Sequence, residues 1–276
     1  MNVLRTLIYG DEVSLTLADT TELAREGIKR HLLQGEAAEV FARTLAFSTF
    51  ASACLKMETG SISLALKTDG KIADLCVSGD RALSIRGYLD WSEEATEKVG
   101  SGTLSVIRDD GYNRPFVGAC EAAKGEDIDI SFEDYYFTSE QLPTFIKTAY
   151  ETNEQGEVTF CGIVVLQPLP FASEETFAKI PDGFQLEDIL LKVKTDGLLK
   201  VAEENFGALE EKCNYREAAY RCNCSREYLK RVIVSVGEAE LRRIVKEDGA
   251  IGVHCHYCNT DYIFTDEDAD ELFSKQ

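Results

Sequence analysis

The amino-acid sequence predicts an α+β protein with a mixed N-terminal region and a cysteine-rich C-terminal tail. Three pairs of strand-like segments, each joined by a turn that contains Gly, indicate antiparallel sheet within the first 170 or so residues. Helical segments interrupt these pairs at irregular intervals, which argues against βαβ repeats and a doubly wound fold. Two closely spaced cysteine pairs, 30 residues apart, indicate a separate metal-binding module at the C-terminal end.

Two consecutive helices are expected near the N-terminus. Thr20, Thr21 and Glu22 form a capping sequence for a helix that runs to about Gln34, with apolar residues at helical spacing. Residues 36–57 are rich in Ala, Leu and Phe and leave few polar positions. A helix that is apolar on all sides is normally buried, so we expect this second helix to lie at the centre of the domain.

Three hairpins are expected after these helices. Their paired segments are 61–67 with 72–78, 103–108 with 114–121, and 144–152 with 158–167. The connecting sequences contain Asp-Gly or Gln-Gly, which supply the backbone freedom that a hairpin turn requires. A short helix at about 132–141 lies between the second and third hairpins.

A boundary is predicted where Pro168, Pro170 and Pro181 fall within fourteen residues, because proline interrupts both helices and strands. The segment that follows carries an amphipathic helical pattern, interrupted by Gly197: Leu186, Ile189, Leu190, Val193, Leu198, Val201 and Phe206. Such a helix is stable only when its apolar face is docked, either permanently or reversibly. The sequence therefore predicts an N-terminal α+β domain (1–173), a helical linker (174–221) and a cysteine-rich domain (222–276).

Composition and charge narrow the classes of function. The formal net charge is −20, and an excess of this size repels the phosphates of nucleic acids and anionic membrane surfaces. The N-terminal apolar stretch is too short for a signal peptide, and no stretch approaches a transmembrane length. We therefore expect a cytoplasmic protein that binds neither nucleic acid nor membrane.

The cysteines carry the clearest chemical signal. Nine cysteines, an odd number, without a secretory signal argue against a disulfide scaffold. Cys222 and Cys224 can face one metal ion from an extended segment, and Cys255 and Cys258 can do so through a tight turn. Four thiolates at such spacing predict one structural zinc ion per chain.

The remaining cysteines and the nearby histidines have simpler interpretations. Cys54, Cys76, Cys120 and Cys161 lie singly in apolar segments, where cysteine usually acts as a small hydrophobic residue. Cys213 is interpreted as a spare thiol. His254 and His256 flank Cys255 and could each replace a thiol, although four cysteines already complete a tetrahedral shell. Two helices, capped by Ser225 and beginning at Glu238, are expected between the cysteine pairs.

Several motifs together resemble the heat shock protein 33 family of redox-regulated bacterial chaperones. The resemblance rests on Cys-Asn-Cys-Ser-Arg-Glu at 222–227, Lys-Glu-Asp-Gly at 246–249, Cys-His-Tyr-Cys at 255–258 with Tyr262 and Phe264, and Phe-Glu-Asp-Tyr-Tyr-Phe-Thr-Ser-Glu-Gln-Leu-Pro-Thr at 132–144. The three-part layout extends it over essentially the whole chain. The chain departs from the family pattern at Tyr228, where a basic residue is frequent, and by the additional Cys213.

The resemblance implies a holdase that works without ATP and is activated by oxidation. Zinc-bound thiolates would be oxidised to disulfides, by family analogy Cys222–Cys224 and Cys255–Cys258, and zinc would be lost. The linker would then undock and expose apolar surface that holds unfolding client proteins. The family's oxidised form also dimerises, so a homodimer is expected after oxidation.

Two other classes of function remain open at this point. A zinc module that binds DNA or RNA is disfavoured, because residues 222–276 contain seven Lys and Arg against eleven Asp and Glu. A thiol oxidoreductase is disfavoured because no βαβ context accompanies the Cys-x-x-Cys pair. No Ser/His/Asp set or phosphate loop is visible either, and His31 stands apart, so we do not expect an enzyme.

Overall fold

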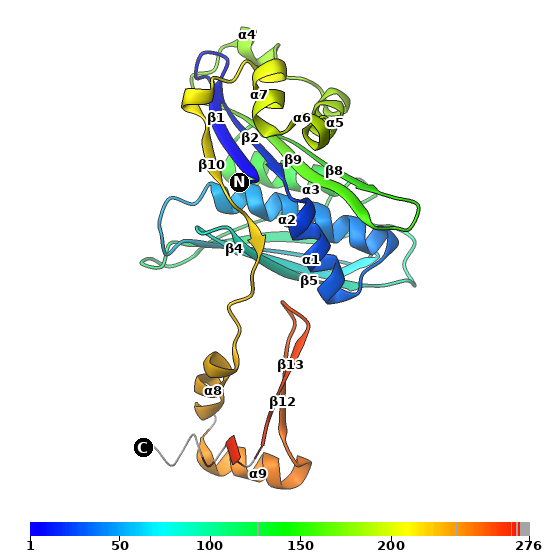
Figure 1. Cartoon of the computed structure of the whole chain (residues 1–276), viewed down its shortest axis with the longest axis vertical. Helices are drawn as coiled ribbons and strands as arrows, with labels where there is room; N and C mark the ends of the chain where they lie inside the picture. The colour runs from blue at the N-terminus through cyan, green and yellow to red at the C-terminus, as the bar shows by residue number, and fades with distance from the viewer. Residues whose placement is uncertain (126, 236, 266, 269, 271–276) are drawn as a thin grey trace. The chain divides into compact units, whose positions relative to one another are not determined.

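The computed structural model describes residues 1–125, 127–235, 237–265, 267–268 and 270. The chain divides into two compact units, Met1–Arg221 and Cys222–Gln276. Among the residues that the structure describes, no helix combines the length and apolar character needed to cross a membrane. The α+β fold expected from the sequence is confirmed, with helices and mainly antiparallel β-structure in both units (Figure 1).

Unit 1 contains two large sheets. The five-stranded sheet has the order β10 (Asn214–Arg216), β1 (Val3–Ile8), β2 (Val13–Asp19), β9 (Val158–Pro168), β8 (Phe145–Thr152). The six-stranded sheet has the order β11 (Ala219–Tyr220), β5 (Ser84–Trp91), β4 (Ile72–Asp80), β3 (Ser61–Thr68), β6 (Gly102–Asp109), β7 (Phe116–Glu121). The three predicted hairpins are the antiparallel pairs β3–β4, β6–β7 and β8–β9.

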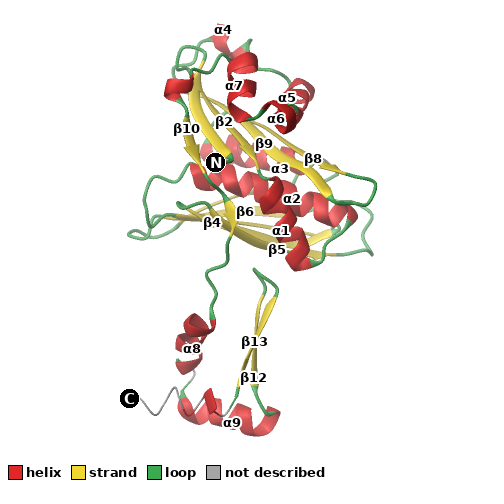
Figure 2. Ribbon diagram, in the orientation of Figure 1, coloured by secondary structure: helices red, strands yellow, loops and turns green. Residues whose placement is uncertain are grey.

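The two sheets enclose the helices α1 (Thr21–His31), α2 (Gly35–Ala53) and α3 (Ile128–Tyr135), as Figure 2 shows. Helix α2 contacts strands of both sheets, and fifteen of its 19 residues are buried. The prediction of a central, buried second helix is therefore confirmed. The main core gathers side chains from α2, α3 and the inner faces of both sheets, including Phe47 and Phe132, whose rings stack with centroids 4.0 Å apart.

The start of α1 differs from the prediction. Thr20 precedes the helix, but its hydroxyl donates to the carbonyl oxygen of Cys161 at 3.2 Å instead of capping α1. The cap is supplied by Asp19, whose Oδ1 accepts from the backbone N–H of Thr21 at 3.0 Å. The Thr20 hydroxyl that the sequence predicted as the cap is therefore bonded to strand β9 instead.

Helix α3 begins at Ile128, four residues before the expected start, because Asp127 caps it by accepting from the N–H of Asp129. A π-helical turn (Tyr136–Glu140) continues it. Two carboxylates one turn apart on α3 bind the edge strand β8. Asp129 accepts from the N–H of Thr148 at 2.9 Å, and Glu133 accepts from the N–H of Ile146 at 2.7 Å.

The segment after β9 folds against the outer face of the five-stranded sheet. It contains α4 (Glu174–Phe177), α5 (Gly183–Leu191), α6 (Val193–Asp196), α7 (Leu198–Phe206) and a 3₁₀ turn (Glu210–Lys212). Gly197, at φ 80°, separates α6 from α7, as its helix-breaking character predicts. The amphipathic stripe of this segment and the outer sheet face form a second core: Leu4, Leu15, Leu17, Phe160, Val164, Leu166, Leu186, Leu190, Val193, Val201 and Phe206.

Residues 214–220 then join the two sheets, with β10 beside β1 and β11 parallel to β5. Tyr220 fixes the end of this segment, since its hydroxyl donates to the carbonyl oxygen of Gly87 at 3.0 Å. The His31 ring lies 3.0 Å from the same hydroxyl.

Unit 2 contains α8 (Arg226–Val234), α9 (Glu238–Asp248) and the hairpin β12 (Ile251–Cys255) and β13 (Thr260–Phe264). Ser225 caps α8 by accepting from the N–H of Tyr228, as expected. Helix α9 begins at Glu238 and ends at Gly249, whose φ of 82° is the left-handed stop predicted from Asp-Gly. Among the described residues of this unit, the hydrophobic core contains the buried side chains of Leu229, Ile233, Leu241, Val245 and Phe264.

Candidate metal centre

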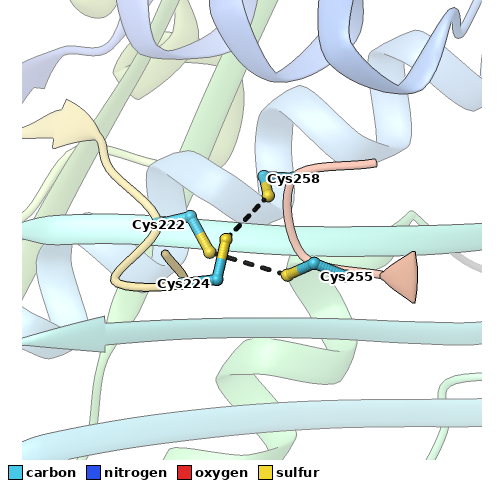
Figure 3. Close-up of side chains that lie close together, drawn as sticks. All are labelled: Cys222, Cys224, Cys255 and Cys258. Atoms are coloured by element: carbon cyan, nitrogen blue, oxygen red, sulfur yellow. Dashed lines mark hydrogen bonds between the residues drawn. The ribbon is translucent and has the colours of Figure 1, made fainter. Parts of the chain in front are cut away.

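The four cysteines of the C-terminal pairs meet in unit 2. Cys222 and Cys224 lie in the extended segment just before α8, while Cys255 ends β12 and Cys258 lies in the turn that leads to β13. Their sulfur atoms all lie within 4.8 Å of one another (Figure 3). Residues 33 and 34 positions apart are thus brought together by the helical segment between them.

The hairpin turn fixes the second pair. The N–H of Cys258 donates to the carbonyl oxygen of Cys255 at 3.3 Å, which closes a tight turn and directs both thiols to one side. Asn259 follows at φ 51°, in the left-handed region that Asn tolerates better than most residues. The hydroxyl of Thr260 donates to the carbonyl oxygen of Cys258 at 3.2 Å.

The sulfur distances fit a tetrahedral metal site. The Sγ atoms of Cys222 and Cys255 are 3.8 Å apart, and those of Cys224 and Cys258 are 3.1 Å apart. With metal–sulfur bonds of about 2.3 Å, tetrahedral geometry places sulfur atoms roughly 3.8 Å apart. Four soft thiolate donors at this spacing are suited to zinc, and a small outward movement of Cys224 or Cys258 completes the arrangement.

The thiols differ in acidity. Burial raises the pKa of Cys224, but hydrogen bonds from Tyr262, Cys258 and the other thiols outweigh it and lower that pKa to about 7. The Tyr262 hydroxyl lies 3.2 Å from the Cys224 sulfur. Burial raises the pKa of Cys222 to about 11, and burial also raises the pKa of Cys258. Cys224 is therefore more acidic than Cys222 and Cys258.

Neither nearby histidine belongs to the cluster among the described residues. His254 Nδ1 lies 2.8 Å from Asp261 Oδ1 across the hairpin, and the His256 ring packs against the His254 ring with centroids 4.9 Å apart. Sequence reasoning identified the four cysteines but missed Tyr262 as a hydrogen-bond donor to one of them. The alternation along β13 could have indicated that Tyr262 shares a face with Thr260 beside Cys258.

The other five cysteines all lie in unit 1. Cys161 is fully buried, and burial raises its pKa to about 12. Burial likewise raises the pKa of Cys120 to about 11 and raises the pKa of Cys54. Cys213 donates to the carbonyl oxygen of Leu209 at 3.4 Å. Thiols that stay protonated at neutral pH react slowly with oxidants.

Comparison with known proteins identifies the family of this chain. The family model described as "Hsp33 protein" matches residues 2–265. The chain belongs to the Hsp33 family. Membership supports a chaperone function. The chain is 31% identical to the 33 kDa chaperonin of Acetivibrio thermocellus, over 91% of this chain and 89% of that protein. It is 28% identical to the 33 kDa chaperonin of Bacillus subtilis, over 98% and 97% of the two chains.

A solved structure of the family has the same fold. The crystal structure of the 33 kDa chaperonin (heat shock protein 33 homolog) of Thermotoga maritima matches with a TM-score of 0.81 and 24% sequence identity. The match covers 99% of this chain and 97% of that one, so the likeness includes both units.

Proposed function

We propose that this chain is a redox-regulated holdase, an ATP-independent chaperone activated by oxidation of Cys222, Cys224, Cys255 and Cys258. In the reduced state these four thiolates would hold one zinc ion. The observation that carries the proposal is the approach of the four sulfur atoms to within 4.8 Å of one another in a unit with a very small core. Bound zinc would keep the thiolates deprotonated and join the two cysteine pairs.

The chemistry of activation follows from these thiolates. A thiolate attacks one oxygen of hydrogen peroxide, the O–O bond breaks, and a sulfenic acid and hydroxide form. The neighbouring thiolate then attacks the sulfenic sulfur and displaces its oxygen as a second hydroxide. Each disulfide therefore consumes one peroxide, and the two hydroxides take up two protons from the solvent to become water. Family resemblance suggests the pairs Cys222–Cys224 and Cys255–Cys258. Formation of these bonds removes all four metal ligands.

Loss of the ligands would unfold unit 2. Structural zinc contributes on the order of 10 kcal/mol to the folding of small zinc modules, more than the total stability of many domains. The five buried side chains that form this core among the described residues cannot replace a contribution of that size. Unit 2 would therefore lose its fold when its cysteines are oxidised.

The segment 174–221 would act as the switch in unit 1. Its last residue directly precedes Cys222. The linker is therefore joined directly to the segment that would lose its metal on oxidation. Undocking would expose the outer face of the five-stranded sheet, including Leu15, Leu17 and Leu166, which are now buried under α5 and α7. A contiguous apolar face of this kind is suited to unfolded clients, since it can bind apolar segments without regard to their sequence.

We propose that 1–173 is the chaperone core, 174–221 the linker and 222–276 the redox domain. The protein would act in the cytoplasm, catalyse no reaction, bind neither nucleic acid nor membrane, and form a homodimer after oxidation. The composition supports the absence of nucleic-acid and membrane partners, since the net charge is −20.

The test combines metal content with client protection. Zinc is quantified before and after mild peroxide treatment, while light scattering follows a heat-aggregating client. Cys255→Ser should lower zinc content sharply, whereas the control Cys54→Ser in unit 1 should leave it unchanged. Equal zinc in both variants would refute the ligand assignment. Peroxide that releases zinc without reducing client aggregation would refute the holdase.

A further inference from the structure

Three arginines lie on neighbouring segments of unit 1. Arg5 lies on β1, Arg81 follows β4 in the turn to β5, and Arg216 lies on β10. Within the described ranges, none of the three forms an ion pair with Asp or Glu. In a chain with 49 acidic and 29 basic side chains, a group of arginines without an ion pair requires an explanation.

The strand register places two of these arginines on one face of the five-stranded sheet. Val3 is paired with Arg216 and Arg5 with Asn214, so Arg5 and Arg216 are diagonal neighbours across β1 and β10. Diagonal side chains on one face are roughly 7–8 Å apart, within reach of long side chains. Val3 points into the main core, so this is the face that α2 covers.

The position of Arg5 has a structural explanation. Its Nη1 donates to the carbonyl oxygen of Ala53 at 2.7 Å, at the C-terminal end of α2. Its Nε donates to the hydroxyl of Thr16 at 3.2 Å. A cation at a helix C-terminus interacts favourably with the helix dipole and with its unpaired carbonyl groups.

Arg81 and Arg216 have no comparable explanation. Arg216 donates to the backbone carbonyl of Arg81, and the Nε of Arg81 is buried without a hydrogen-bond partner. Burial and then the charges of Arg81 and Arg5 lower the pKa of Arg216, against the opposing effect of Glu58 and Asp80. Asp80 is itself engaged, because its Oδ1 accepts from the N–H of Ser84 at 3.0 Å.

We propose that Arg81 and Arg216, assisted by Arg5, form a binding site for a small oxyanion of the phosphate class. Guanidinium groups present planar pairs of donors that match the oxygen atoms of phosphate. One bound anion would accept from the terminal N–H groups of Arg81 and Arg216 and neutralise the repulsion between the guanidinium groups. The source of the phosphate group is either inorganic phosphate or the phosphate chain of a nucleotide.

The site joins three parts of unit 1. A bound anion would connect β10 to β1 and to the β4–β5 turn, and so fasten the last strand of the linker. If the proposed switch is correct, phosphate would then oppose linker release. Binding itself does not depend on that switch, since every residue of the site lies in unit 1.

The test measures phosphate binding to the reduced, full-length protein. Thermal unfolding is followed while phosphate replaces chloride at constant ionic strength. The wild type should be stabilised in a saturable manner, and at tenfold the dissociation constant its unfolding equilibrium constant should fall elevenfold. Arg81→Gln and Arg216→Gln should abolish the saturable shift. The control Arg114→Gln, which removes an equal charge from an exposed residue of the same unit, should retain it.

A second signature separates binding from simple loss of structure. Without phosphate, Arg216→Gln should melt at or above the wild-type temperature, because it removes repulsion. With saturating phosphate, Arg216→Gln should melt at a lower temperature than the wild type. Adenosine triphosphate saturating at a lower concentration than phosphate would identify a nucleotide as the source. Equal shifts in the wild type and both site variants, or a shift that never saturates, would overturn the proposal. Neither readout involves client aggregation, so failure here is distinct from failure of the holdase.

Discussion

Leu190→Ala should loosen the linker of the reduced protein. Leu190 lies on α5, is fully buried, and packs against the outer face of the five-stranded sheet. Its Cδ1 would lie only 3.2 Å from a Cβ placed on Gly162, so the leucine occupies space that glycine leaves open. Glycine has no side chain that could refill this space after truncation.

The magnitude follows from that packing. Leu→Ala substitutions in cores cost about 2–5 kcal/mol, and the cost increases with the volume of the remaining cavity. For a site that cannot collapse, about 3 kcal/mol is a reasonable expectation. A loss of this size raises the undocked population of the linker by about 100-fold, since each 1.4 kcal/mol corresponds to a factor of ten.

Limited proteolysis and hydrogen exchange of residues 174–221 would measure this opening without oxidant. The matched control is Leu104→Ala, a fully buried leucine of β6 in the main core. It should lower global stability by a similar amount while the linker stays protected. Leu190→Ala should also hold some client while its zinc is retained. Unchanged linker protection in Leu190→Ala, or equal opening in both variants, would refute the reasoning.

Three further predictions concern other parts of the chain. Burial raises the pKa of Asp129 to about 6, so the folded state binds a proton more tightly than the unfolded state and its stability falls as pH rises from about 4 through 6. Asp129→Asn should therefore be more stable than wild type at pH 7 but not at pH 4, as measured by urea denaturation. A variant that is destabilised more at pH 7 than at pH 4, relative to wild type, would contradict this. A fragment ending at Ala172 should melt cooperatively and bind a hydrophobic dye, because removing the linker uncovers the outer sheet face; a fragment that does not fold would place the chaperone core's boundary further along the chain. Ser225→Ala removes the cap of α8 and should cost about 1 kcal/mol in the stability of unit 2 with zinc content preserved, whereas unchanged stability would show that water replaces the cap.

The sequence predicted best what local chemistry determines. The turns between paired strands contain Asp-Gly or Gln-Gly, and all three expected hairpins are present. The caps of α8 and the end of α9 also follow from single residues with one strong preference, Ser225 and Gly249. The cysteine spacing predicted which side chains meet, because two same-face pairs need only one helical segment to bring them together.

What the sequence did not reveal depends on distant partners. Strand β1 was missed because both of its faces are buried. Val3 faces the main core and Leu4 faces the second core under the linker helices, so the strand lacks the alternation of a half-exposed strand. The pairing of β11 with β5 and the contact between His31 and Tyr220 join residues that are more than 130 positions apart. No local pattern encodes such pairings, which are determined by the complete fold.

The carboxylates of α3 protect a sheet edge, which matters for a protein that meets unfolding chains. A chaperone that meets aggregating chains must avoid recruiting their strands, and an open sheet edge is a template for such growth. The N–H groups of Ile146 and Thr148 on the edge strand β8 are already taken by Glu133 and Asp129. At the opposite margins, β10 and β11 are only three and two residues long, and the Ser139 hydroxyl donates to the carbonyl oxygen of Ala119 on β7. A client bound to the apolar face of the proposed holdase would therefore find few unpaired backbone groups at these described sheet edges to which it could add a strand.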